Sequence, residues 1–257
     1  MNKERDVLIE AVHEAGAAIL ALQETGFAIS RKANNDLLTQ ADLLANDMLK
    51  TRLLQAFPGY GWLSEESADD VSRLAAKRVW VVDPIDGTKE YALGIPEYAI
   101  SVALVEEGEP VLACVFNPAT DEFFHAIKGE GAWLNGHPII CDTSASRRMT
   151  LLASRSECKR GEWDPFLLHH EVKQIGSIAY KLALIAAGQA HATFSLGPKN
   201  EWDIAAGVLL VKEAHGLVTD QFQQPFLFNQ EKVLVNGIVA TSRQANSPVF
   251  EMISGVM

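Results

Sequence analysis

The string Asp-Pro-Ile-Asp-Gly-Thr at residues 83–88 is the strongest chemical signal in the chain. The apolar run Val79–Val82 before it predicts a buried strand, which Pro84 ends because proline cannot continue a ladder of backbone hydrogen bonds. Gly87 allows close backbone approach, and the amides of Gly87 and Thr88 would bind an anion if they begin a helix. Two converging carboxylates beside such a site predict hard cations that bridge to phosphate. An ordinary surface Asp-Gly turn is the alternative that this string alone leaves open.

Other acidic residues follow apolar ones in a way that favours a buried site. Glu65 and Glu66 come directly after Trp62-Leu63, and Asp203 stands between a tryptophan and an isoleucine. A solvated acidic pair and a simple helix N-cap are the alternative interpretations. Burying an unpaired carboxylate is costly, whereas metal coordination compensates its charge. The three segments together therefore favour a metal site.

Several strings of the chain resemble the motifs of a known family. Residues 83–88, the Glu-Glu-Ser string at 65–67 and the Trp-Asp-Ile-Ala-Ala-Gly string at 202–207 look like the three signatures of the lithium-sensitive, magnesium-dependent phosphatases typified by inositol monophosphatase. Residues 36–42 match a fourth string of that family. The motifs occur in order, and the resemblance covers nearly the whole chain.

The resemblance implies Mg²⁺ as cofactor, in two or three ions, with Asp83 bridging two of them. The implied metal ligands are Glu65, Asp83, the carbonyl of Ile85, Asp86 and Asp203. Thr88, hydrogen-bonded to Asp42, would orient the attacking water and help to deprotonate it, and Glu66 would support a further, weakly held ion. Carboxylates suit Mg²⁺, and two ions can clamp the attacking and leaving oxygens without a phosphoenzyme.

A different phosphatase class uses the motif D-x-D-G-T, in which the first aspartate is a covalent nucleophile and the second a proton donor. Here Asp83 and Asp86 are three positions apart instead of two. That spacing does not fit the nucleophile and acid geometry, and Glu65 and Asp203 would have no role in it.

The strings around the motifs favour one phosphate ester over others. Lys89-Glu90-Tyr91 and the segments 176–181, 197–201 and 228–230 resemble the 3'(2'),5'-bisphosphate nucleotidase (CysQ-like) branch. The predicted reaction is hydrolysis of 3'-phosphoadenosine 5'-phosphate to AMP and phosphate. Inositol 1-phosphate is the runner-up, and histidinol phosphate or fructose 1,6-bisphosphate are further candidates. A non-catalytic regulatory protein of the same fold is the alternative from another class.

Residues that would contact the substrate follow from the same strings. The candidates are Gly87, Thr88, Lys89, Ser177, Lys181, Lys199 and Glu201. Lys181 and Lys199 would meet a second phosphate, although a solvated surface charge is the commoner role of any single lysine. Arg155 is a further candidate with the same alternative. Inositol enzymes usually carry a glutamate seven positions before the aspartate equivalent to Asp203; this chain has Leu196 there, and Glu201 is expected to compensate.

The elements that must position these residues can be read from periodicity. Apolar residues at helical spacing predict helices over residues 7–22, ending near Gly26, and over 40–56. Apolar runs separated by turn-forming residues predict a meander of strands over 78–82, 98–105, 111–116 and 122–127. After a seam at residues 143–146, strands are predicted at 150–153 and 191–196 and helices at 178–188 and 203–215. The fold class is a layered α/β (α+β) sandwich, and the resemblance implies the five-layered αβαβα form with lobes 1–142 and 147–257.

Composition narrows the partners. The chain has 257 residues, 48% of them hydrophobic and 21% charged, with a formal net charge of −11. An acidic protein repels long nucleic acids and anionic membranes, so a small phosphorylated metabolite is the expected partner. Three widely spaced cysteines and the lack of a long apolar run favour the cytoplasm. The resemblance also implies inhibition by Li⁺ and an assembly that is often a homodimer.

Overall fold

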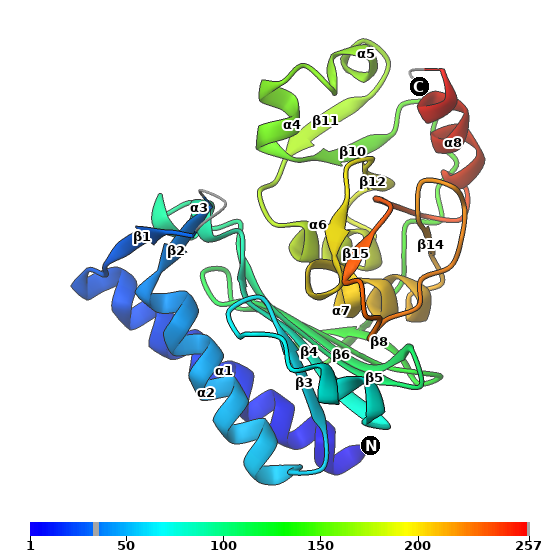
Figure 1. Ribbon diagram of the computed structural model, residues 1–257. Coiled ribbons are helices and arrows are strands. Elements are labelled where there is room, and N and C mark those ends of the chain that lie inside the picture. The colour runs from blue at the N-terminus through cyan, green and yellow to red at the C-terminus, as the bar shows by residue number, and fades with distance from the viewer. Residues whose placement is uncertain (33–35, 256–257) are drawn as a thin grey trace.

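The computed structural model describes residues 1–32 and 36–255, and within these residues helices and sheets stack in five layers (Figure 1). A pair of long helices covers one face of a large sheet, and a second helix pair lies on its other face. A smaller sheet packs on that second pair, and short helices cover its far side. This order confirms the predicted αβαβα sandwich.

Within the described residues, the large sheet has seven strands in the order β3-β4-β5-β6-β7-β8-β9. They are β3 (Gly61–Ser64), β4 (Arg78–Asp86), β5 (Ala99–Glu106), β6 (Glu109–Asn117), β7 (Glu122–Ile127), β8 (Gly131–Leu134) and β9 (His137–Ile139). Strands β4 to β9 are antiparallel, which confirms the predicted meander. The unpredicted strand β3 lies parallel to β4, and the crossover between them contains the short helix η1 (Val71–Ala75).

The first helical layer consists of α1 (Asn2–Thr25) and α2 (Gln40–Ala56). The bounds of α2 are those predicted, but α1 begins five residues before the predicted Val7. Its polar first turn is fixed because the buried Glu4 carboxylate accepts hydrogen bonds from Tyr60 Oη at 2.9 Å and Arg78 Nη1 at 2.8 Å. Among the described residues, no helix combines the length and hydropathy that a membrane span requires.

The second half of the chain supplies the inner helices and the smaller sheet. Helices α6 (Ile178–Ala186) and α7 (Glu201–Glu213) pack on the large sheet. The smaller sheet contains β10 (Thr150–Ala153), β11 (Glu171–Gln174), β12 (Ala192–Ser195), β14 (Leu217–Thr219) and β16 (Ile238–Thr241). Of these strands, β10 and β12 were predicted and β11, β14 and β16 were not.

The remaining described elements are short or peripheral. They are the hairpin β1 (Ile29–Arg31) and β2 (Leu37–Thr39), α3 (Thr88–Ala92), α4 (Arg155–Lys159), α5 (Asp164–Leu167), the pair β13 (Lys199–Asn200) and β15 (Leu234–Val235), and α8 (Asn246–Ser254). The segment predicted as a seam, residues 143–146, lies between β9 and β10. One apolar cluster joins both sheets, with Val115, Leu182, Leu210 and Ile238 among its members, so the two predicted lobes share a core. The residue limits of the lobes stay a prediction.

Close packing of α6 against α7 depends on Gly207. A Cβ atom at this position would lie 2.4 Å from Leu182 Cδ1 and 2.5 Å from Leu182 Cβ. The latter atom is attached to the backbone and cannot rotate away. The inner helices can therefore approach only because residue 207 has no side chain.

We expect Gly207→Val to lower the free energy of unfolding by about 2 kcal/mol or more, because the added side chain overpacks this interface. Urea denaturation monitored by circular dichroism measures the change. The control is Gly59→Val, since a Cβ at Gly59 meets nothing within 4 Å. Equal effects of the two substitutions would contradict the proposed close packing.

Candidate metal centre and substrate pocket

The end of β4 turns both aspartates of the main motif toward one cavity. The pairing of β4 with β5 shifts register between Asp83 and Asp86, and Ile85 N donates to Asp83 Oδ1 at 3.1 Å. Gly87 then has φ 94°, in the left-handed region, and its missing Cβ would lie 3.0 Å from Glu97 O. The chain thus makes a tight turn into α3 that only glycine fits well.

The four carboxylates predicted as metal ligands are among the acidic side chains that line one cavity, whose volume is about 570 Å³. Oxygen atoms of Glu65, Asp83 and Asp203 lie within 4.8 Å of one another, and Asp86 lines the cavity beside them. They come from the turn after β3, the end of β4 and the start of α7. The structure therefore brings together all four carboxylates that the sequence predicts as metal ligands, and Ile85 lines the same cavity.

Enclosure of these like charges changes their protonation. Burial, together with the neighbouring carboxylates, raises the pKa of Asp83 well above its usual range. Burial likewise raises the pKa of Asp86 to about 6 and, with the charge on Asp86, that of Asp203 to about 8. Nearby lysines compensate only part of this negative charge, because the pKa values of Asp86 and Asp203 stay raised although Lys181 and Lys199 lower them. The donor atoms of the cluster are oxygens. The residues thus fit Mg²⁺, which prefers carboxylate oxygen.

Asp86 is held by the start of α6. Its Oδ2 accepts hydrogen bonds from Ser177 Oγ at 2.5 Å and from Ala179 N at 2.6 Å. Ser177 also caps the helix, because its Oγ accepts from Tyr180 N at 2.9 Å. A helix N-terminus stabilises a carboxylate, so α6 fixes the orientation of Asp86.

The prediction that Ser177 contacts substrate is wrong in this structure. The residue is fully buried, and the amides of Gly176 and Ser177 both donate to Glu97. Gly176 itself still lines the cavity, whereas Ser177 does not. The sequence string correctly indicated a segment beside the cavity. It did not show that the polar groups of Ser177 are already hydrogen-bonded within the protein.

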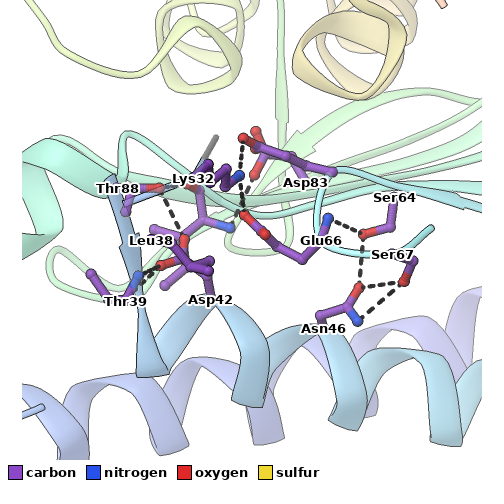
Figure 2. Close-up of polar contacts among 12 residues, drawn as sticks. Lys32, Leu38, Thr39, Asp42, Asn46, Ser64, Glu66, Ser67, Asp83 and Thr88 are labelled. Atoms are coloured by element: carbon purple, nitrogen blue, oxygen red, sulfur yellow. Dashed lines mark hydrogen bonds and ion pairs between the residues drawn. The ribbon is translucent and has the colours of Figure 1, made fainter. Parts of the chain in front are cut away.

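Thr88 and Asp42 form the predicted pair (Figure 2). Thr88 Oγ1 lies 2.9 Å from Asp42 Oδ1 and 3.1 Å from Ile85 O, so the hydroxyl proton can be donated to either acceptor. Asp42 Oδ2 accepts from Thr39 N at 2.7 Å and from Thr39 Oγ1 at 2.6 Å, in a capping box at the start of α2. The contact between Thr88 and Asp42 is confirmed, and its role in activating water stays a prediction.

Lys32 is a site residue that sequence reasoning missed. Its Nζ lies 2.7 Å from Glu65 Oε1 and 2.5 Å from Glu66 Oε1, so one ammonium bridges both glutamates. Figure 2 shows the contact with Glu66. The predicted role of Glu66 toward a further ion would require Lys32 to release one contact. Nothing in the sequence places this lysine beside residues more than thirty positions away; only its position shortly before the family-like string at 36–42 could have drawn attention to it.

The turn that carries the two glutamates is itself braced by α2. Ser64 Oγ donates to Asn46 Oδ1 at 2.8 Å, and Trp62 Nε1 donates to Ser67 Oγ at 3.1 Å (Figure 2 shows the serine and asparagine contacts). Ser67 Oγ also lies 3.3 Å from Asn46 Oδ1. These bonds fix the path of the backbone at Glu65, and hence the place of its carboxylate.

Basic side chains line the cavity around the carboxylates. Lys89, Lys181, Lys199 and Arg155 all face it. Lys181 is only 2% exposed, so the surface role common for lysines is wrong for this residue. Burial and the neighbouring Lys199 lower its pKa to about 8, although Glu157 opposes that shift. The cavity therefore offers both a carboxylate cluster and an ammonium group suited to an anion.

Glu157 is a second residue that sequence reasoning missed. It is buried, lines the cavity, and accepts hydrogen bonds from Ser195 Oγ at 2.6 Å and Trp163 Nε1 at 3.1 Å. Arg155, by contrast, is already paired with Glu97, its Nη2 lying 2.5 Å from Glu97 Oε1. Glu157 thus supplies a fixed negative charge near Lys181 and Lys199.

Glu201 corrects a further prediction. It is fully buried, does not line the cavity, and accepts hydrogen bonds from Asn229 N at 2.5 Å and Gln230 N at 2.9 Å. Two positions along a helix are about 200° apart, so Glu201 faces away when Asp203 faces the cavity. Glu201 therefore does not replace the carboxylate missing at Leu196, which packs with the apolar cluster beneath α8 instead.

The fold and the cavity define a class: a five-layered α/β protein with a candidate site for divalent cations where its layers meet. Comparison with protein families identifies the group within that class. The model of the inositol monophosphatase family matches residues 1–250, and the chain belongs to this family.

Individual relatives agree with this assignment. A Rhizobium meliloti protein named inositol-1-monophosphatase is 36% identical over 226 residues, which cover 84% of each chain. A Xylella fastidiosa protein named Nus factor SuhB is 36% identical over 227 residues, covering 84% of this chain and 81% of that protein. The solved structure of an IMPase from Thermotoga maritima matches with a TM-score of 0.89 at 26% identity, covering 100% of this chain and 98% of that one. None of these three is named a nucleotidase.

The raised pKa values predict how Mg²⁺ affects stability. Folded-state pKa values of about 8 for Asp203 and about 6 for Asp86 exceed the unfolded value of 3.8. The metal-free protein therefore loses stability as the pH rises from the unfolded value of 3.8 to about 8. Protons compete with Mg²⁺ at low pH. We expect Mg²⁺ to raise the melting temperature more at about pH 8.5 than at about pH 6, as measured by scanning calorimetry against a chelated sample.

The variant Asp83→Asn supplies the comparison for this measurement, because it removes one of the negative charges of the cluster. We expect this variant to melt higher than the metal-free wild type at about pH 8.5 and to respond little to Mg²⁺. The exposed Asp6→Asn serves as the control. A Mg²⁺ effect that is absent, or independent of pH, would contradict the proposed metal centre.

Proposed function

We propose that the protein is a Mg²⁺-dependent phosphomonoesterase that acts on a small phosphate ester. The observation that carries this proposal is the convergence of Glu65, Asp83, Asp86 and Asp203 on one cavity that also contains Thr88. Membership of the inositol monophosphatase family supports phosphatase activity, as does the name of the Rhizobium meliloti relative.

Each residue has a distinct task in this proposal. Glu65, Asp83, Asp86, Asp203 and the carbonyl of Ile85 would hold the ions, with Asp83 shared between two of them. Mg²⁺ would supply charge neutralisation for the phosphate and a lowered pKa for the attacking water. Thr88 would orient that water through its hydroxyl, and Asp42 would accept the hydroxyl proton. The Gly87-Thr88 turn at the start of α3 lets the phosphate approach the backbone closely.

For the substrate we propose 3'-phosphoadenosine 5'-phosphate. The cavity holds a buried lysine, Lys181, with Lys199 also lining it, and these two ammonium groups would attract a second phosphate on the substrate. Lys89 lines the cavity directly after the catalytic threonine. Leu196 adds no carboxylate for the hydroxyls of an inositol ring.

Inositol 1-phosphate is the second candidate substrate, favoured by the name of the Rhizobium meliloti relative. A regulatory role is a candidate of another class, favoured by the Xylella fastidiosa relative, which is named Nus factor SuhB. The intact carboxylate cluster supports catalysis, because a protein without that chemistry would gain nothing from enclosing four acidic groups. We also propose a cytoplasmic location, inhibition by Li⁺ and assembly as a homodimer.

The function is tested by phosphate release from four esters: 3'-phosphoadenosine 5'-phosphate, inositol 1-phosphate, fructose 1,6-bisphosphate and histidinol phosphate. We expect the nucleotide to give the highest kcat/KM with Mg²⁺, and chelation to abolish release because the ions hold and neutralise the phosphate. Full activity under chelation would refute the metal-dependent reaction. Preference for inositol 1-phosphate would reverse the order of substrates, and no release from any ester would favour the regulatory candidate.

The second phosphate is tested by Lys181→Met, which keeps the length of the side chain and removes its charge. We expect KM for 3'-phosphoadenosine 5'-phosphate to rise about tenfold or more, since a contact between charged groups is lost. The rate with inositol 1-phosphate, which has a single phosphate, should change little. Lys173→Met is the matched control, because Lys173 is exposed on β11. Equal losses with both esters would show that Lys181 does not bind a second phosphate.

A further inference from the structure

A group of polar residues, whose charged members Arg73 and Glu201 are buried, connects two segments that carry candidate metal ligands. We call it the Arg73–Glu201 bracket; it consists of Arg73, Asn229, Gln230 and Glu201. Arg73, on η1, has a side chain that is 1% exposed. Its Nη1 donates to Asn229 Oδ1 at 2.7 Å and its Nη2 donates to Gln230 O at 3.0 Å.

The second half of the bracket joins the same loop to α7. The Glu201 carboxylate accepts the backbone amides of Asn229 and Gln230, at 2.5 and 2.9 Å. Glu201 is the first residue of α7, and its own amide donates to Val233 O at 2.8 Å. Two residues further on, Asp203 Oδ2 accepts from Asn200 N at 2.9 Å. The start of α7 is therefore fixed from both sides.

Both ends of the bracket are connected along the chain to candidate metal ligands. The turn with Glu65 runs from β3 into η1, where Arg73 lies, and Glu201 precedes Asp203 on α7. Neither Arg73 nor Glu201 lines the cavity, so neither would contact a metal ion or substrate. Glu65 and Asp203 each present an oxygen to the same cluster.

We infer that Glu201 and Arg73 are positioning residues that set the separation of Asp203 from Glu65, and so tune the affinity of the site for divalent cations. This inference rests on the proposed function, because it presumes a cation at those carboxylates.

The physical reason is the precision that coordination demands. Ligand distances to a metal ion tolerate deviations of about 0.2 Å, whereas apolar layers can slide with little change in buried area. Directional bonds from the buried Arg73 and Glu201 to the loop at 229–230 resist such sliding. Apolar side chains could fill the same volume at similar or better stability, because burying charged groups is costly. Arg73 is paired with Asp69, its Nε lying 2.6 Å from Asp69 Oδ1, and Glu201 accepts two backbone amides. Charged groups enclosed at this place therefore favour control of geometry over added stability.

The test compares Glu201→Gln with wild type. A glutamine offers one carbonyl oxygen and turns an NH₂ group toward one of the two amides, so one bond is lost and the loop must move. Partners that orient metal ligands typically change metal affinity by about 10- to 100-fold. We expect calorimetric titration of the substrate-free protein with Mg²⁺ to show binding weakened by about tenfold or more.

A matched control separates positioning from stability. Glu4→Gln alters another buried glutamate with two side-chain donors, Tyr60 and Arg78; it belongs to α1, which lies across the large sheet from α7 (Figure 1). It should lower the melting temperature and leave Mg²⁺ affinity unchanged. If Glu201→Gln does not fold, Asn229→Gly replaces it; it removes the acceptor of Arg73 Nη1 and suits the positive φ of 58° at this position.

Amide hydrogen exchange provides a readout that needs no metal. We expect faster exchange at residues 199–206 and 228–231 in Glu201→Gln, and unchanged exchange in β4. Wild-type Mg²⁺ affinity and wild-type exchange in a destabilised Glu201→Gln would overturn the inference. If the wild type itself binds no Mg²⁺, the proposed function fails, and exchange at residues 199–206 still decides whether the bracket orders α7.

Discussion

Electrostatic repulsion among four enclosed carboxylates is the constraint on which the rest of this structure depends. Glu65, Asp83, Asp86 and Asp203 face one cavity, and the raised pKa values of the three aspartates record how poorly protein alone compensates the charge. Such a cluster is stable only if protons, an ammonium group or bound cations supply positive charge. Lys32 supplies part of it between the two glutamates, and a divalent cation is the group that suits the remaining oxygen atoms.

The layered fold can be understood as the frame that holds these charges in place. The carboxylates come from the large sheet, from the turn beside α2 and from α7, while α6 orients Asp86 with its first amides. No single element could bring them together, because each contributes one or two residues. The shared apolar core between the sheets keeps α6 and α7 fixed against β4. Packing energy from the layers thus offsets the cost of concentrating like charges.

Much of this arrangement could be predicted from the sequence, for physical reasons. Long periodic segments such as α2 and strong apolar runs such as β7 carry their own signal, and the motif at residues 83–88 marks a strand that ends in a turn. The partners of single polar groups could not be predicted. Glu201 and Asp203 are both acidic, and the sequence does not distinguish their roles. In the helix, Glu201 faces the loop at 229–230 and Asp203 faces the cavity. Lys32 and Glu157 likewise become site residues only through contacts distant in sequence.

The central claim is that the enclosed carboxylates exist to bind divalent cations. Crystals grown with Mn²⁺, a close chemical substitute for Mg²⁺ at oxygen ligands, would test it through the anomalous scattering of manganese. We expect anomalous peaks among Glu65, Asp83, Asp86 and Asp203, with Asp83 touching more than one ion. Well-ordered crystals without an anomalous peak in this cavity, at saturating Mn²⁺ and neutral pH, would contradict it.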